Sequence, residues 1–274
     1  MVPVRDGTFR SVIPFACYVR GLSTGAWGWK RDGSGAHVGP MYWETVQSAA
    51  ALISPARLLP PDDVRVQGYL DVLEDRLLLE NPNAARHDWF AAGWQYQGGL
   101  ERTANVHLAG DDIPAFLRSF LNCYAIDVVP DQGYVFNEHA TRGPPDKIFE
   151  EAAFLERFRH LLVGEEGSTL WLARATPRAW LETGKRIAVS NAPSYFGTLA
   201  YEIVSDVDHG RINATVVLPS RQAPQSVVLR FRHPKAAPIR GVTVDGREWD
   251  SFSPDKETIE LKGLNGTVAV TAKY

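Results

Sequence analysis

The sequence predicts a multidomain α plus β protein: helical hairpins come first, and an antiparallel β-sandwich follows. Apolar residues recur every three or four positions before residue 170, which is the helical period. After residue 185 they alternate, which is the period of a half-buried strand. A single change of period near the middle of a chain favours two packed units of different class. We place these units at residues 1–166 and 167–274.

Composition excludes several classes of function. The chain has 274 residues, of which 45% are hydrophobic, enough for two cores of ordinary size. The formal net charge is -3, so the sequence lacks the excess of basic residues that binding to a nucleic acid or a membrane surface favours. No apolar run approaches the ~20 residues of a membrane span. The N-terminus lacks the pattern of a signal peptide, so we expect a cytoplasmic protein if the chain is complete.

Metal and cofactor sites are not expected either. The only cysteines, Cys17 and Cys123, make neither a disulfide framework nor a zinc site, and buried thiols are the favoured interpretation. The seven histidines show no pair spaced by four residues on one helix. The sequence also lacks a P-loop and a dinucleotide-binding glycine pattern.

In the first part, the helical period predicts five helices separated by short breaks or by long loops rich in aromatic residues. Their expected ranges are 41–58, 64–79, 100–109, 113–126 and 146–163. Prolines and acids at 60–63 suit a helix start, and Gly110-Asp111-Asp112 is a tight break with a capping acid. Hairpins of this kind stack into bundles, solenoids or α/α toroids.

In the second part, alternation predicts seven strands, near 185–190, 198–204, 211–218, 226–232, 239–244, 257–262 and 266–273. Asp245-Gly246 and Asn265-Gly266 are hairpin signals, because both residue types tolerate positive φ. Between the two parts, Thr176-Pro177 predicts the capped start of one short helical turn.

Several segments resemble bacterial proteins of the six-hairpin (α/α)6 glycosidase class. The junction carries the resemblance, in LWLARATPRAWL (170–181), KRIAVSNAP (185–193) and Phe196-Gly197. RFRHP (230–234) and VTVDG (242–246) are similar to the sandwich of that group, as DGTF (6–9) and YWE (42–44) are to segments further upstream. The resemblance implies a toroid of helical hairpins followed by a β-sandwich, and glycoside hydrolysis as the activity.

The helix pattern departs from that class, because six hairpins make a complete ring and five helices are predicted here. We therefore expect a partial toroid. Either a second copy of the chain or an N-terminal partner chain would complete it.

Glycoside hydrolysis needs two carboxyl groups facing each other across the scissile bond. Three acids lie beside aromatic residues at expected helix starts or in loops, and we take Glu101 and Glu138 as acid or base and Glu44 as a ligand of a sugar hydroxyl. Pyranose faces are apolar and stack on aromatic rings. The expected sugar-stacking residues are Trp27, Trp29, Trp43, Trp94 and Tyr96.

Other interpretations of these residues remain open. The acids could balance helix dipoles or lie solvated in loops, and the large rings could fill a helical core. The chain could also be a non-catalytic module or fragment that binds a glycan or a protein, or a structural fragment that self-associates through an apolar face. The pairs Glu150-Glu151 and Glu165-Glu166 are expected to be solvated.

Overall fold

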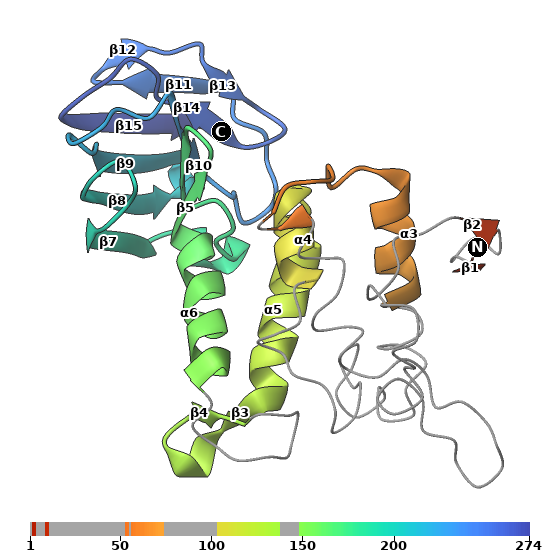
Figure 1. Cartoon of the computed structure of the whole chain (residues 1–274). Helices are drawn as coiled ribbons and strands as arrows, with labels where there is room; N and C mark the ends of the chain where they lie inside the picture. The colour runs from red at the N-terminus through yellow and green to blue at the C-terminus, as the bar shows by residue number, and fades with distance from the viewer. Residues whose placement is uncertain (1, 4–8, 11–52, 55, 74–102, 138–147) are drawn as a thin grey trace, which may run out of the picture. The chain divides into compact units, whose positions relative to one another are not determined.

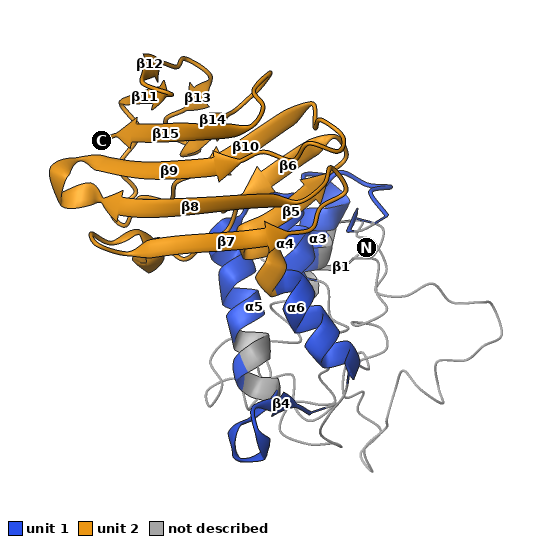
Figure 2. Ribbon diagram, turned by 90° about the vertical axis from the view of Figure 1, so that its left-hand side faces the viewer, with its two compact units in different colours: residues 1–157 blue, residues 158–274 orange. Residues whose placement is uncertain are grey.

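The computed structural model describes residues 2–3, 9–10, 53–54, 56–73, 103–137 and 148–274 (Figure 1). The chain divides into two compact units, residues 1–157 and 158–274 (Figure 2), which we call the helical unit and the β unit. It is a mixed α+β protein in which a few helices precede two larger sheets. None of the helices in the described ranges has the length and apolarity needed to cross a bilayer.

The described part of the helical unit holds α3 (Val64–Leu73), α4 (Thr103–Ala109), α5 (Ile113–Asp127) and the start of α6 (Ile148–Leu162). It also holds the hairpin of β3 (Val128–Val129) and β4 (Val135–Phe136), and the pair of β1 (Val2–Pro3) and β2 (Phe9–Arg10). The predicted helices over 113–126 and 146–163 are confirmed. The predicted toroid stays a prediction.

Acidic caps set where two of these helices begin. The Asp63 carboxylate accepts a hydrogen bond from the backbone N–H of Arg65 at 2.8 Å, and α3 starts at the next residue, Val64. The Asp112 carboxylate accepts one from the N–H of Ala115 at 3.1 Å, and α5 starts at Ile113. Both side chains satisfy amides that have no partner inside the helix, as predicted for these breaks.

One predicted helix boundary is wrong. The helix expected over 41–58 falls mostly outside the described residues, but its last turn is not helical. Arg57 has a φ of 53°, and its N–H bonds to the carbonyl of Ile53 at 3.2 Å. A residue in the left-handed region ends a helix, so the chain turns before Leu58.

Aromatic side chains hold three elements of the helical unit together. Ring centroids are 6.0 Å apart for Phe116 and Phe120 of α5, and 5.5 Å apart for Phe120 and Phe154 of α6. Phe136 of β4 lies 5.3 Å from Phe154. Phe116 and Phe120 are fully buried, so this cluster forms part of the core of the unit.

The β unit has two large sheets. The first runs in the order β13 (Phe252–Ser253), β14 (Thr258–Glu260), β10 (Ser226–Arg230), β6 (Thr169–Leu172), β5 (Val163–Glu166). The second runs in the order β12 (Arg247–Glu248), β11 (Gly241–Val244), β15 (Thr267–Lys273), β9 (Arg211–Val217), β8 (Leu199–Asp206), β7 (Arg186–Ala192). Each of the seven predicted strands is present, as β7 to β11, β14 and β15.

Alternating side chains from both sheets form one hydrophobic core. Leu172 and Leu229 come from the first sheet, whereas Ile203, Val216 and Val270 come from the second, and none is more than 1% exposed. Along β8 every second residue is buried, from Leu199 to Ser205. The two sheets therefore stack as layers around a shared interior (Figure 2).

The prediction of a wholly antiparallel arrangement is wrong in one place. β10 pairs with β6 in parallel, with Val227 opposite Leu170 and Leu229 opposite Leu172. β5 and β6 form a hairpin that adds to the first sheet. Val163, predicted as the end of the last helix, is the first residue of β5. The first sheet is therefore mixed, and the second is antiparallel.

The two hairpin signals have different outcomes. Asp245 and Gly246, with φ of 49° and 78°, form the two-residue turn between β11 and β12, as predicted. Asn265-Gly266 is not a hairpin, because the strands before and after it belong to different sheets. There, the carbonyl of Gly266 accepts a hydrogen bond from the N–H of Leu218. The glycine has a positive φ in both dipeptides, but neither dipeptide determines which strands pair.

Candidate functional site

All eight predicted site residues lie outside the described residues. They are Glu44, Glu101, Glu138, Trp27, Trp29, Trp43, Trp94 and Tyr96. Cys17 and the side chain of Cys123 lie outside them as well. The roles assigned to these residues remain predictions. Among the described residues, no group of three or more His, Cys, Asp or Glu side chains is arranged to hold a metal ion.

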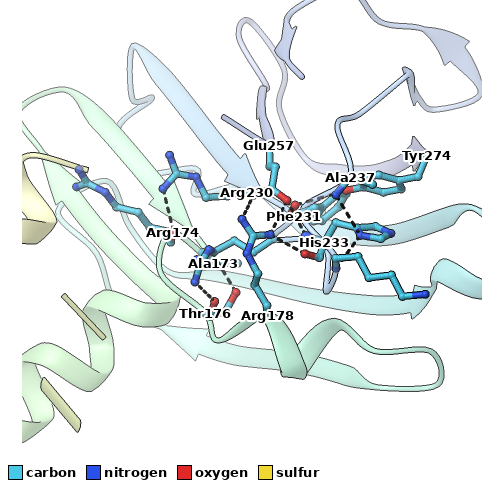
Figure 3. Close-up of polar contacts among 12 residues, drawn as sticks. Ala173, Arg174, Thr176, Arg178, Arg230, Phe231, His233, Ala237, Glu257 and Tyr274 are labelled. Atoms are coloured by element: carbon cyan, nitrogen blue, oxygen red, sulfur yellow. Dashed lines mark hydrogen bonds and ion pairs between the residues drawn. The ribbon is translucent and has the colours of Figure 1, made fainter. Parts of the chain in front are cut away.

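A cluster of polar side chains in the β unit joins the junction segment to the end of β10 (Figure 3). We call it the arginine cluster, and its members are Arg174, Arg178, Arg230, Arg232, His233 and Glu257. Except for Arg178, each is at most 7% exposed. Arg174 follows β6, Arg178 lies in the 3-10 turn η6 (Arg178–Leu181), and Glu257 precedes β14. The predicted junction helix is therefore a single 3-10 turn.

Glu257 is the centre of the cluster. Arg178 approaches it with two parallel hydrogen bonds, Nη1 to Oε1 and Nη2 to Oε2, both 2.8 Å. The backbone N–H of His233 donates to the same Oε1 at 2.8 Å, and Arg178 Nη1 also donates to the His233 carbonyl at 2.6 Å. Glu257 has a φ of 55°, a conformation that costs free energy for a side chain with a Cβ. The bidentate ion pair between Arg178 and Glu257 is the strongest form of guanidinium–carboxylate contact.

Two further arginines bind backbone carbonyls of the junction. Arg230 donates to the carbonyl of Arg174 at 3.1 Å, and Arg232 donates to that of Thr176 at 2.9 Å. Thr176 was predicted to cap η6, but that turn has no side-chain cap. The Thr176 hydroxyl instead donates a weak hydrogen bond to the Ala173 carbonyl at 3.5 Å. Two of the segments on which the glycosidase resemblance rests, 170–181 and 230–234, are therefore joined by side chains of the second segment.

His233 closes the other side of the cluster. Its Nδ1 accepts hydrogen bonds from the N–H groups of Lys235 at 3.1 Å and Ala237 at 3.4 Å. Its ring lies 4.6 Å from that of Tyr274, the last residue of the chain. Burial lowers the pKa of His233 and the nearby Arg178 and Lys235 lower it further, against the opposing charge of Glu257. The neutral ring therefore acts as an acceptor that holds a turn.

The arginine cluster is built to hold structure rather than to perform chemistry. Arg178, Arg230 and Arg232 direct their guanidinium groups at carbonyls of the chain, and Glu257 already has three donors. A general acid or base needs a proton that can reach a substrate. The sequence signal for this cluster was RFRHP, but alternation alone could not show that its arginines are buried.

All four acids expected to be solvated have partners or are buried. Glu151 accepts a hydrogen bond from the N–H of Phe136 at 3.3 Å. Glu165 is only 8% exposed and forms two hydrogen bonds with Arg159, at 2.7 and 2.8 Å. Glu166 accepts from the Trp171 indole and from Arg174, both at 3.2 Å. Glu150 is 2% exposed. The expectation failed because charge in the sequence does not show which face of an element packs inward.

Comparisons with known proteins give a distant structural likeness. No protein-family model matches the chain, and no curated protein sequence matches it. A solved structure named "Glycoside hydrolase" aligns with a TM-score of 0.30 and 12% sequence identity. The alignment covers 65% of this chain and 31% of that one, so the chain spans less than a third of the matched protein. A likeness this distant does not establish a family.

Proposed function

We propose that this chain is part of a carbohydrate-processing protein and that its helical unit carries glycoside hydrolysis. The supporting observation is the arginine cluster. Its two halves, 170–181 and 230–234, are about 50 residues apart, and both resemble the six-hairpin glycosidase class. Arg178 and Arg232 bind them to each other. Contact between the two resembling segments supports the view that they form one inherited structural unit.

In this proposal the β unit has a structural role and takes no part in the reaction. In the described part of the β unit, Glu165 is paired with Arg159, Glu257 with Arg178 and Glu202 with Arg186. A carboxylate held by a guanidinium is a poor general base. The paired carboxyls would be Glu101 and Glu138, with Glu44 holding a sugar hydroxyl and the nearby indole rings stacking on the sugar.

Charge-neutral substitutions of the two acids test this proposal. We expect Glu101→Gln or Glu138→Gln to abolish release of sugar from an oligosaccharide, while far-UV circular dichroism and thermal unfolding stay unchanged. Glu202→Gln, in an exposed ion pair of the β unit, is the matched control and should keep full activity. Unchanged rates in both test variants would refute glycoside hydrolysis by these residues.

A non-catalytic module is the second candidate. The supporting observation is the helix pattern, because the five predicted helices are too few for the complete ring of the class that the chain resembles. This candidate predicts glycan or protein binding without turnover. It is favoured if the wild-type chain releases no sugar from any oligosaccharide yet binds one in calorimetry.

A further inference from the structure

The connection between β7 and β8 forms a rigid loop, which we call the Tyr195 loop, Pro193–Gly197. The Ser194 and Gly197 backbones bond to each other in both directions at 3.1 Å, and the Ser194 hydroxyl donates to the Gly197 carbonyl at 2.6 Å. Gly197 has a φ of 122°, and a Cβ there would lie 3.1 Å from the Arg221 side chain. Only glycine fits this close approach without displacement.

Guanidinium groups from two other segments clamp the loop. Arg159 donates to the Pro193 carbonyl at 2.9 Å, and Arg221 donates to the Tyr195 carbonyl at 2.6 Å. Phe196 is only 5% exposed and belongs to the core of the β unit. Because the residues on both sides of Tyr195 are fixed, the loop sets the position of its backbone and the direction of its Cα–Cβ bond.

The Tyr195 ring is presented outward. Tyr195 is 75% exposed, whereas no other large hydrophobic residue in the described β unit exceeds 42%. A tyrosine has only two side-chain torsions, so a ring on a rigid loop loses little conformational entropy when it binds a partner. Tyr195 is not part of the buried core of the β unit, so its ring is available to a binding partner.

Charge beside the ring is positive. The guanidinium of Arg159 is matched by the carboxylate of Glu165 at 2.7 Å. Arg221 is exposed, and none of the ion pairs among the described residues includes it. An arginine fork recognises a carboxylate with two parallel hydrogen bonds.

We propose that Tyr195 and Arg221 form a binding site for a uronate-bearing saccharide, with the pyranose stacked on the ring and the carboxylate on the guanidinium. This inference rests on the proposed carbohydrate function and gives it a substrate class. A saccharide fits better than a protein. One ring beside polar residues matches a single sugar, whereas a stable protein interface needs a larger surface with an apolar centre.

Calorimetric titration of the full chain with trigalacturonate tests the site. We expect Tyr195→Ala to weaken binding about tenfold or more, and Tyr195→Phe to retain it. Arg221→Gln should weaken binding and remove its dependence on salt. Tyr134→Ala is the matched control, because Tyr134 is also in a turn and 65% exposed, and it should bind normally.

Several outcomes overturn the proposal. Absence of binding up to about 10 mM would do so, as would equal weakening by Tyr134→Ala, or equal affinity for neutral maltotriose. Self-association that requires Tyr195, seen by sedimentation, would assign the ring to a protein contact instead. The proposed hydrolysis is tested separately, because Glu101→Gln and Glu138→Gln should abolish turnover while leaving trigalacturonate binding at Tyr195 unchanged.

Discussion

At the scale of single residues, the Arg178–Glu257 pair joins two distant segments of the β unit by a bidentate ion pair. Removing the guanidinium in Arg178→Met leaves the buried carboxylate of Glu257 charged and with one remaining hydrogen-bond donor. We expect a loss of about 2–3 kcal/mol of unfolding free energy, less than for a fully buried pair because Arg178 is 32% exposed. Urea denaturation measures it.

The matched control is Arg186→Met in the pair with Glu202. These side chains are 60% and 42% exposed, so solvent screens their attraction and the loss should stay below about 1 kcal/mol. Equal losses of unfolding free energy in the two variants would contradict the proposed contribution of the Arg178–Glu257 pair to stability.

His233 predicts how the stability of the β unit depends on pH. Its folded-state pKa is lowered chiefly by burial, so the unfolded chain binds a proton first as pH falls. The stability that the neutral ring contributes is complete above about pH 6.5 and is lost as pH decreases through the lower folded-state pKa. Midpoints of urea unfolding between pH 7 and pH 5 measure this loss.

The exposed His209 provides the comparison for that titration. His209→Gln should keep the decline of stability below pH 6.5, whereas His233→Gln should be less stable at pH 7 and show a flatter profile. An identical slope in wild type and His233→Gln would exclude His233 as the group responsible.

Some of the residue-level picture could be predicted and some could not. The caps of Asp63 and Asp112 followed from local rules, because a cap bonds to amides two or three residues away. The partners of Glu257 could not be predicted, because Arg178 is separated from it by 79 residues. Long-range pairing depends on the fold, which local patterns do not encode.

At the scale of elements, the strands of the β unit were predictable and their pairing was not. Alternation identifies a half-buried strand, and it located β7 to β9 within two residues at each end. The parallel pairing of β10 with β6 brings together residues 57 positions apart, Ser226 and Thr169, and no turn signal specifies it. The order of the strands within each sheet therefore could not be predicted from the sequence pattern.

The Tyr195 loop gives a prediction at this scale. Gly197→Ala places a Cβ against Arg221 at a φ of 122°, so we expect a loss of about 1–3 kcal/mol of stability. Gly241→Ala is the control, since no atom lies within 4 Å of its added Cβ, and it should be close to neutral. Thermal unfolding compares the two, and a neutral Gly197→Ala would show that the loop is not rigid.

At the scale of the whole molecule, α6 carries an apolar stripe that bears on the partner predicted to complete a ring. Ile148 and Leu155 are 81% and 65% exposed, and Ala152 between them is exposed as well. Their spacing places them on one face of the helix. If a second copy covers this face, the chain should sediment as a dimer and Leu155→Ser should shift it to monomer. A monomeric wild type would contradict self-association.

The most direct test of the account is the arrangement of the predicted acids in a crystal structure with a bound oligosaccharide. We predict that two of the carboxyl groups of Glu44, Glu101 and Glu138 lie about 5–9.5 Å apart on either side of a glycosidic bond, with an indole ring from Trp27, Trp29, Trp43 or Trp94 against the sugar. Carboxyl groups that point to separate surfaces would contradict glycoside hydrolysis by this chain.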